Sequence, residues 1–467
     1  MYSTFFRLSG LGQESAKWGE NRFFVFSERL HPKLLEDALE RVGSTSLPII
    51  KGRIICEPSS GLYWGVENNA GFEFKYDVVH DEELSAVLAS SQGEAAMSDS
   101  RFKEFFPPLF PGVGWSNPIV LVRVTVFEPA GFSLLAFTLP HGVFDASSTL
   151  AFVKLWDAAC ASSSGMDRVG GEARHAERYP VRFPRPGLMA EKALLSRFDP
   201  DFIDSKLALG AAQEMVTTLT LLQATHRFRR FIVRGEPLER LKNKVNAALS
   251  SDSRVSTNEL LFAMGLFSTH LAEVAKGNET FQPGKEVDWT FCVVTDMRER
   301  TDMFPGQSYI GNAFARRVFT VKAPTPHRDD DIFTGIVNYS RFVHQEIRKA
   351  IGNRAAMEDQ FALGELQHLR PDLIDSVFNY RRIHLIRSNG HDMNSWKRFS
   401  SYFDITLGGA SRPIYMNNTP LYGDFCLPRM YLVIPTRPDG TVDIRSHLTP
   451  AENDQLETLC THFGLFG

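Results

Sequence analysis

One histidine and one aspartate, separated by three residues, could carry out proton transfer in this chain. They lie in the segment His141-Gly-Val-Phe-Asp145, which follows the apolar run 132–139 and Pro140. A neutral imidazole has a pKa of about 6.5, so it is a competent base at cellular pH. A strand that ends at His141 would place the ring at a sheet edge, within reach of a ligand. We therefore expect that His141 can take a proton from a hydroxyl or an amine.

The residues around this segment predict the elements that position it. Apolar runs on either side of a Pro- and Gly-containing turn predict a hairpin, with strands over 119–127 and 132–139. An amphipathic helix is expected over 146–161, with Trp156 on its apolar stripe. Asp145 stands where the N-cap of this helix belongs. The structural role expected for Asp145 is therefore to cap this helix, and that role does not exclude a second one.

Helices and strands are mixed along the rest of the chain, which predicts an α/β or α+β protein. Ser256 and Glu259 have the spacing of a capping box ahead of an apolar helix. The other expected elements are helices over 32–42, 260–274, 331–351 and 450–462, strands over 228–233 and 287–294, and a hairpin with strands over 431–435 and 441–445.

The length of 467 residues is too great for a single hydrophobic core. The periodic pattern weakens between residues 162 and 223, where Gly- and Pro-rich segments are typical of loops and linkers. We therefore expect an N-terminal domain over 1–190, a crossover linker over 191–225 and a C-terminal domain over 226–467.

Charge and composition exclude several classes of protein. The net charge is −4 and the basic clusters are short, which argues against nucleic-acid binding. No apolar run reaches membrane-spanning length, and the N-terminus lacks the pattern of a signal peptide. The five cysteines are scattered without C-x-x-C spacing, as expected for reduced thiols in the cytoplasm. The sequence therefore predicts a cytoplasmic protein.

No motif for a chemically reactive cofactor is present. The chain has no G-x-S-x-G elbow, Walker loop or H-E-x-x-H motif. The acidic run Asp329–Asp331 is interpreted as a helix start, so no metal site is predicted. Without a reactive cofactor or metal, an increase in reaction rate must come from a general base, from holding two substrates together and from stabilising an oxyanion. These three effects are sufficient for a reaction with an activated acyl donor such as a thioester.

Several segments in the same order resemble the BAHD-type acyltransferases of the chloramphenicol acetyltransferase-like superfamily. The run 141–148 (HGVFDASS) matches the signature H-x-x-x-D-[GA]-x-S. The runs 255–258 (VSTN), 296–300 (DMRER) and 309–312 (YIGN) resemble further motifs of the family. One histidine after Pro140 argues against condensation domains of peptide synthetases, which carry two adjacent histidines. The resemblance is to fungal enzymes of specialised metabolism, such as trichothecene O-acetyltransferases.

This resemblance implies an α/β fold of two similar domains with a tunnel at their interface. Acyl-CoA would enter from one face and a small-molecule acceptor from the other. His141 would be the general base, and Asp145 would turn away from the substrate to pair with an arginine, for which Arg298 is the candidate. The chain would work as a monomer with no permanently bound cofactor.

The resemblance also implies roles for residues of the second domain. Asn394, Ser395 and Trp396 align with a segment near the oxyanion, where the Asn394 amide would donate a hydrogen bond. The family motif D-F-G-W-G is not intact. We align it with Asp404–Gly409, which makes Asp404 a supporting residue and Asp424 a chance match. The expected donor-binding residues are Ser256, Thr257, Arg298 and Asn312.

The function that this resemblance implies is the acyl-CoA-dependent transfer of an acyl group, expected to be acetyl, to a hydroxyl or amine of a specialised metabolite. One alternative is the release or cyclisation of a polyketide thioester bound to an acyl carrier protein. A second alternative is a non-catalytic ligand-binding relative on the same scaffold.

Overall fold

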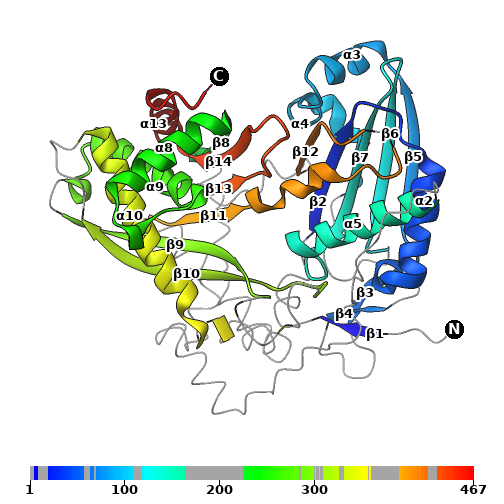
Figure 1. The fold of residues 1–467 in the computed structure, drawn as a ribbon, viewed down its shortest axis with the longest axis horizontal. Helices are drawn as coiled ribbons and strands as arrows, with labels where there is room; N and C mark the ends of the chain where they lie inside the picture. The colour runs from blue at the N-terminus through cyan, green and yellow to red at the C-terminus, as the bar shows by residue number, and fades with distance from the viewer. Residues whose placement is uncertain are drawn as a thin grey trace.

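The computed structural model describes the chain in two lobes, each built on a mixed sheet with helices packed against it (Figure 1). The expected linker 191–225 lies outside the described residues except for its last two positions, and Asp424 also lies outside them. The described residues are 5–8, 19–56, 64–67, 70–108, 118–163, 224–282, 285–298, 300, 304, 309–324, 331–355, 357–358, 389–409, 411–418 and 429–466.

The first lobe contains a five-stranded sheet in which the predicted hairpin lies at the centre. Strands β5 (Glu73–His80) and β6 (Leu121–Glu128) run parallel, and the other neighbouring strands run antiparallel. The last residue of β7 is Pro140, so the strand ends immediately before His141, as the sequence predicts. The order is β12 (Tyr415–Asn418), β2 (Gly19–Phe26), β7 (Phe132–Pro140), β6 (Leu121–Glu128) and β5 (Glu73–His80). A separate small sheet consists of β1 (Phe5–Arg7), β4 (Trp64–Glu67) and β3 (Arg53–Cys56).

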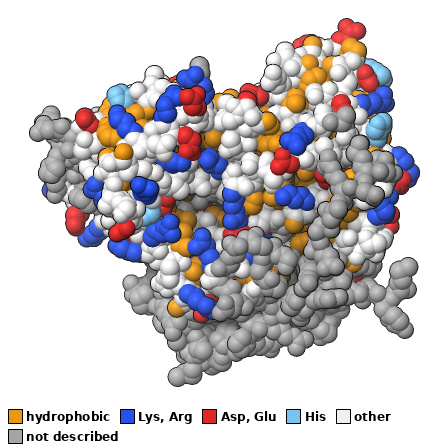
Figure 2. All heavy atoms as spheres, viewed as in Figure 1, with side chains coloured by type: hydrophobic (Ala, Val, Ile, Leu, Met, Phe, Trp, Pro, Cys, Tyr) orange, Lys and Arg blue, Asp and Glu red, His pale blue; other side chains and the backbone are white. Residues whose placement is uncertain are grey.

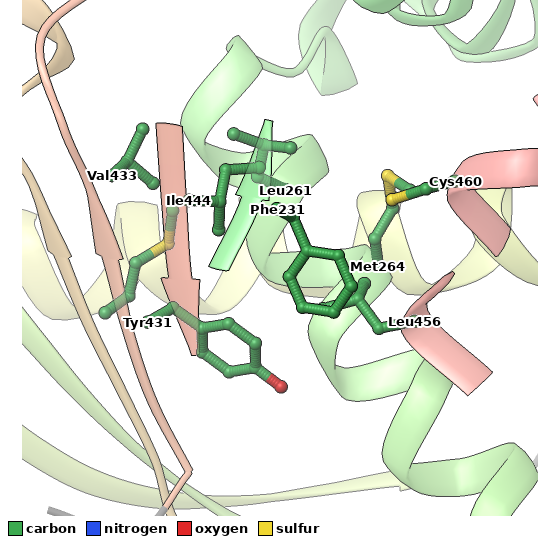
Figure 3. A pocket seen from close by; sticks show the side chains of 9 residues that line it. Phe231, Leu261, Met264, Tyr431, Val433, Ile444, Leu456 and Cys460 are labelled. Carbon is green, nitrogen blue, oxygen red and sulfur yellow. The ribbon is translucent and has the colours of Figure 1, made fainter. Parts of the chain in front are cut away.

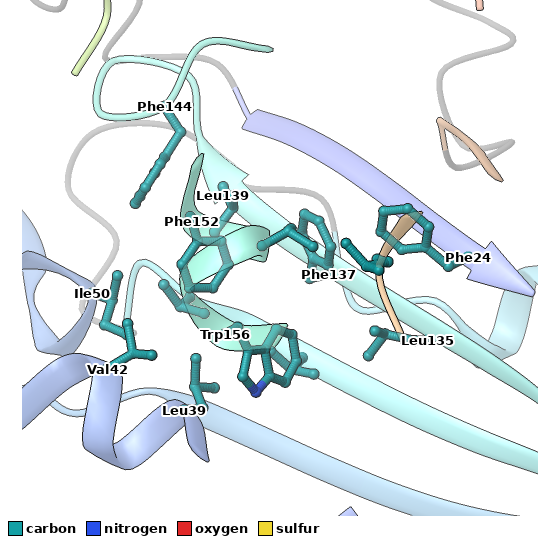
Figure 4. Packing of buried hydrophobic residues seen from close by; sticks show 14 of the residues in the cluster. Phe24, Leu39, Val42, Ile50, Leu135, Phe137, Leu139, Phe144, Phe152 and Trp156 are labelled. Atoms are coloured by element: carbon teal, nitrogen blue, oxygen red, sulfur yellow. The ribbon is translucent and has the colours of Figure 1, made fainter. Parts of the chain in front are cut away.

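Helices cover both faces of the five-stranded sheet. On one face, the expected stripe of the helix after Asp145 is buried: Phe152 stacks on Trp156, and the Trp156 indole donates a hydrogen bond of 2.8 Å to the carbonyl oxygen of Leu35 (Figure 4). Burial of such a side chain contributes roughly 1.5–3 kcal/mol. This packing fixes α5, and therefore the loop ahead of it. The helices are α2 (Pro32–Arg41) and α5 (Ala146–Ser163) on this face, and α3 (Glu82–Ser90) and α4 (Ala95–Ser98) on the other.

Among the described residues, the second lobe contains a six-stranded sheet and four α-helices. Strand β11 runs parallel to both of its neighbours, β9 and β13, and the other pairs are antiparallel. The order is β10 (Phe314–Pro324), β9 (Glu286–Asp296), β11 (His391–Ser395), β13 (Met430–Val433), β14 (Val442–Leu448) and β8 (Arg227–Val233). The helices are α8 (Gly235–Ala248), α9 (Thr257–Ala275), α10 (Ile332–Gly352) and α13 (Pro450–His462).

The predicted capping box fixes the start of α9. The Ser256 hydroxyl accepts a hydrogen bond of 3.2 Å from the N–H of Glu259, and the Glu259 carboxylate accepts one of 2.6 Å from the N–H of Ser256. Two N–H groups at the helix start are thereby satisfied. The prediction is confirmed, and the start of α9 is held at a defined place.

The chain crosses back into the first lobe after β11, a feature that the sequence analysis does not contain. Residues 399–407 contribute aromatic and aliphatic side chains to the core of the first lobe. Strand β12 then adds an edge strand to the five-stranded sheet by pairing with β2. Residues that follow Ser395 therefore connect the two lobes. The expected domain limits at 190 and 226 stay a prediction.

Gly265 tests the packing of the second lobe. In Figure 3, Tyr431 of β13 lies beside α9, close to an apolar cavity of about 10 Å³. A Cβ at Gly265 would lie 2.4 Å from Cζ of Tyr431. Gly265→Ala is expected to lower the free energy of unfolding by about 1–3 kcal/mol, because overpacking forces a buried ring to move.

Urea denaturation measures this change, and Gly352→Ala is the matched control. A Cβ at Gly352, which ends α10, meets no heavy atom within 4 Å. The control is expected to change the free energy of unfolding by less than about 1 kcal/mol. If both substitutions lowered the free energy of unfolding equally, the close contact between Gly265 and Tyr431 would be contradicted.

Candidate active site

The loop that carries His141 is held by hydrogen bonds at both ends. The carbonyl oxygen of Pro140 accepts hydrogen bonds of 3.0 Å from the N–H groups of Val143 and Phe144, whose side chains are buried. On the other side, the Asn312 amide donates a hydrogen bond of 3.0 Å to the carbonyl oxygen of His141. Backbone and second-lobe contacts therefore fix the position from which the imidazole projects.

Asp145 forms a two-pronged ion pair with Arg298, as the sequence analysis expects. The Arg298 Nη1 and Nη2 atoms donate to the two carboxylate oxygens at 2.8 and 2.9 Å. Asp145 is 3% exposed and Arg298 is 2% exposed. The carboxylate also accepts hydrogen bonds of 2.9 Å from the N–H groups of Ser148 and Ala313. Asp145 therefore caps α5 and binds Arg298 at once.

Arg298 connects this ion pair to the rim of the cavity. Its Nη1 atom lies 3.0 Å from Asp296, whose carboxylate also accepts hydrogen bonds from Ser147 and Arg398. Burial alone would raise the pKa of Asp296, but the charge and backbone N–H of Arg298 lower it to about 2. The carboxylate therefore stays ionised. For Arg298 itself, burial lowers the pKa but the charges of Asp145 and Asp296 outweigh it, so the net shift is upward.

A cavity of about 400 Å³ lies where the two lobes meet, and His141 is part of its wall. This volume is within the usual range of roughly 300–1,000 Å³ for small-molecule sites. Figure 2 shows side chains of both charges on the visible face, with Lys and Arg grouped near its middle. First-lobe lining residues are Glu20, His141, Asp145, Ala146 and Ser147. Second-lobe lining residues include Ser256, Asn258, Arg316, Asn394, Ser395 and Trp396.

The surroundings of His141 keep its imidazole neutral. The ring packs on Phe314, with centroids 4.8 Å apart. Burial is the main cause that lowers the pKa of His141. The charges of Arg316 and Arg22 act in the same direction, its own backbone and Asp145 oppose them, and the net result is a pKa of about 4. Within the described part of the chain, Nδ1 has no hydrogen-bond partner in another residue. A neutral ring in a cavity wall can accept a proton.

A second buried ion pair lies beside His141, and the sequence analysis missed it. Arg22 is fully buried and forms an ion pair with Glu20, which lines the cavity. The Glu20 carboxylate also accepts a hydrogen bond of 2.6 Å from Thr149. The Arg22 guanidinium lies 4.0 Å from the centroid of the Trp396 ring, close enough for a cation–π contact. Two residues of opposite charge, Glu20 and Arg22, directly ahead of the apolar run 23–26 were the available signal.

The three residues expected near the oxyanion, Asn394, Ser395 and Trp396, all line the cavity. Ser395 donates a hydrogen bond of 2.8 Å to the side chain of Asn258, at the start of α9. Trp396 is 7% exposed and packs into the first-lobe core as well as on Arg22. These three residues therefore lie at the cavity, and their role toward an oxyanion stays a prediction.

Of the four expected donor-binding residues, only Ser256 lines the cavity, and the role of the set toward the donor stays a prediction. Ser256 lines the cavity as the cap of α9. Thr257 instead donates to Glu239 at 3.1 Å. Arg298 has its nitrogens engaged by Asp145, Asp296 and carbonyl groups. Asn312 holds the His141 loop. These three side chains do not line the cavity. They support the histidine loop or the protein interior.

Asp404 does not reach the site. Its side chain is 63% exposed and lies 3.3 Å from Arg412, and exposed ion pairs of this kind contribute little. The segment is held instead by Asp157 of α5, whose carboxylate accepts hydrogen bonds from the N–H groups of Thr406 and Leu407 at 2.9 and 2.6 Å. The expectation that Asp404 supports the structure therefore stays a prediction, and its ion pair with Arg412 is exposed.

Across the described residues, no helix is both long and apolar enough to cross a membrane. Within the same ranges, no group of three or more His, Cys, Asp or Glu residues could hold a metal ion.

Breaking the ion pair between Asp145 and Arg298 is expected to destabilise the protein strongly. Asp145→Asn should lower the free energy of unfolding by about 3–5 kcal/mol, because a buried guanidinium loses a charged partner. Thermal and urea unfolding measure the change. Glu236→Gln removes an exposed ion pair with Arg240 and should cost no more than about 0.5 kcal/mol. A loss for Asp145→Asn as small as that of the control would contradict the account.

The acid titration of His141 is a second prediction. NMR of labelled histidine should show that the ring stays neutral well below pH 6.5 and gains a proton toward pH 4. Between these values the folded protein binds fewer protons here than the unfolded chain, so the stability that the neutral ring contributes is lost as the pH falls. His141→Gln identifies the signal. Titration at pH 6.5 or above would contradict the described surroundings.

Comparison with known proteins identifies the fold. No family model and no curated protein matches the chain. Among solved structures, F. graminearum TRI101 complexed with coenzyme A and T-2 mycotoxin is 15% identical with a TM-score of 0.68, and the match covers 98% of this chain and 97% of that one. F. sporotrichioides TRI101 complexed with coenzyme A and T-2 is 16% identical with a TM-score of 0.65 over the same shares.

Vinorine synthase is 14% identical with a TM-score of 0.58, and the match covers 99% of this chain and 93% of that one. All three similarities extend over nearly the whole chain, so they include both lobes and the junction between them. At such low identity they establish the fold alone. The chain therefore has the α/β fold of TRI101 and vinorine synthase, in agreement with the fold class that the family resemblance implies.

Proposed function

We propose that this protein is an acyl-CoA-dependent acyltransferase. It moves an acyl group, expected to be acetyl, from the thioester to a hydroxyl or amine of a specialised metabolite. The observation that carries this proposal is the position of His141, a neutral base in the wall of a 400 Å³ cavity built from both lobes. Such a cavity can hold two reactants beside one base.

The solved structures of the same fold support the choice of donor. The F. graminearum and F. sporotrichioides TRI101 structures contain coenzyme A together with a second small molecule, T-2. Acyl-CoA is therefore the proposed co-substrate here, with no permanently bound cofactor. The proposed tunnel would admit the donor and the acceptor from opposite faces.

In the proposed reaction, His141 takes the proton of the acceptor hydroxyl or amine. The acceptor oxygen or nitrogen then forms a bond to the thioester carbon, and the carbonyl oxygen becomes an oxyanion. When the oxyanion collapses, the carbon–sulfur bond breaks and His141 returns the proton to the leaving thiolate. The imidazole ends as it began, and no covalent intermediate on the protein is needed.

Contacts around His141 support the proposed arrangement of the reacting groups. Asp145 binds Arg298 rather than His141, so its role is to hold the loop and not to share the proton. A displacement of a reacting group by about 1 Å can cost roughly 10²-fold in rate. Asn394 lines the same cavity and offers an amide N–H to the developing oxyanion.

Substitution of His141 tests the proposal. Purified protein should release free coenzyme A from acetyl-CoA in the presence of an acceptor from a panel of terpenoid and alkaloid alcohols and amines. His141→Ala should reduce the rate by roughly 10²–10⁴-fold, the usual contribution of a general base. A thiol-detecting assay measures the rate, and calorimetry with acetyl-CoA should show nearly unchanged affinity.

His80→Ala is the control, because His80 is an exposed histidine at the end of β5 and does not line the cavity. It should leave the rate unchanged. Full activity of His141→Ala would end the proposal. Failure to bind any CoA ester, with binding of an acyl carrier protein instead, would favour the carrier-bound thioester as the donor.

A further inference from the structure

One side chain lies between the cavity that His141 lines, called the reaction cavity from here on, and the apolar cavity of the second lobe. The apolar cavity has a volume of about 10 Å³, and its lining side chains are all buried and come from the sheet, α9 and α13 (Figure 3). Among the described residues, Met393 is the one that lines both cavities. The side chain of Met393 therefore separates the two spaces.

Strands β9 and β11 separate from each other at Met393. Strand β11 pairs with β9 as far as the pair Met393–Val293. Beyond this pair, β9 continues to Asp296 along β10, and β11 continues to Ser395 along β13. The residues that follow the last pair line the reaction cavity, and they are Val294, Thr295 and Asp296 of β9 and Asn394 and Ser395 of β11. Met393 therefore lies where the reaction cavity reaches the gap between the two strands.

The side chain of Met393 lies on the helix-covered face of the sheet. Met393 pairs with Tyr431 of β13, and side chains of paired residues lie on the same face. Tyr431 lines the apolar cavity together with Leu261 and Met264 of α9, which packs on this face. Met393 is 7% exposed and belongs to the same buried cluster. Its thioether therefore closes the reaction cavity on the side of α9.

An enclosed apolar space next to a reaction centre is suited to the end of an acyl chain. In the proposed reaction the thioester carbonyl group lies between His141 and Asn394, and Met393 precedes Asn394 on β11. The carbonyl carbon carries the acyl chain and the sulfur of coenzyme A. The arm on the sulfur contains amide groups and must lead back to solvent, because buried amides without partners are costly. The acyl chain is apolar and can end inside the protein.

We propose that Met393 sets the length of the acyl group that this protein transfers. The inference rests on the proposed function and deepens it, because it names the residue that restricts the donor to short acyl groups. Methionine has three side-chain atoms beyond Cβ, and a chain longer than acetyl would have to displace them. The apolar cavity has room for about one water molecule, so it cannot take up a displaced thioether.

Met393→Ala removes these three atoms, and two donors that differ by three carbons test the effect. Calorimetry measures the affinity of the wild-type protein and of the variant for acetyl-CoA and for pentanoyl-CoA. The wild-type protein should bind acetyl-CoA at least as tightly as pentanoyl-CoA. In the variant, the ratio of the two affinities should shift toward pentanoyl-CoA by roughly 10–60-fold, because each buried methylene adds about fourfold.

Met264→Ala is the matched control. Met264 lines the same apolar cavity from α9 but does not line the reaction cavity. Its truncation leaves Met393 in place, so the ratio of the two affinities should change by less than about fourfold, the value of one methylene. Both methionines are buried, so similar unfolding temperatures of the two variants exclude a general loosening of the lobe as the cause.

Met393→Val is a second variant that keeps the test decisive if the alanine variant does not fold. Valine is favoured in strands and still fills part of the space, but it lacks the thioether end. It should shift the ratio of the affinities for butanoyl-CoA and acetyl-CoA in the same direction, by a smaller factor. A crystal structure of the variant with butanoyl-CoA should show the chain directed toward α9.

Two results would overturn the inference and leave the proposed function intact. One is that acetyl-CoA binds but the ratio of the affinities is unchanged in the Met393 variants. The other is that Met264→Ala shifts the ratio as much as Met393→Ala does, so that Met393 has no specific role. Failure of every CoA ester to bind the wild-type protein would instead overturn the proposed function, and this inference with it.

Discussion

The ion pair between Asp145 and Arg298 is the interaction on which the rest of the site depends. Its partners are 153 residues apart in sequence and come from different lobes. Burial of two charges is costly, and a buried ion pair alone is weak evidence for stability. Here both carboxylate oxygens and the Arg298 nitrogens have further hydrogen-bond partners, which offset that cost. The same contacts fix the loop that presents His141.

The cavity follows from the way the lobes meet. Residues 399–407 and 415–418 from the second half pack into the first lobe, so the junction is built from interwoven segments of the chain and not from two flat faces. Asp157 holds this returning segment, and Trp396 lies between the cavity and Arg22. Charged residues from both lobes lie near the base, with Glu20 and Arg22 on β2 and Arg316 on β10. The imidazole therefore works among fixed charges rather than in water.

The sequence predicts the elements with strong local signals. The hairpin that ends at His141, the helix that Asp145 caps and the capping box at Ser256 are all confirmed, because each depends on residues close together in the chain. The pairing of Asp145 with Arg298 came from the family resemblance. The Glu20–Arg22 pair, the Asp157 contacts and the true surroundings of Thr257 and Asn312 depend on packing between distant segments, which periodicity does not encode.

The central claim is that donor thioester and base meet in one cavity between the lobes. A crystal structure of the protein with coenzyme A measures this most directly. The account predicts that the ligand enters the cavity and places its sulfur within about 3–4 Å of the His141 imidazole, or one water away. Coenzyme A bound elsewhere, or a His141 ring turned away from the sulfur with no space for an acceptor, would contradict it.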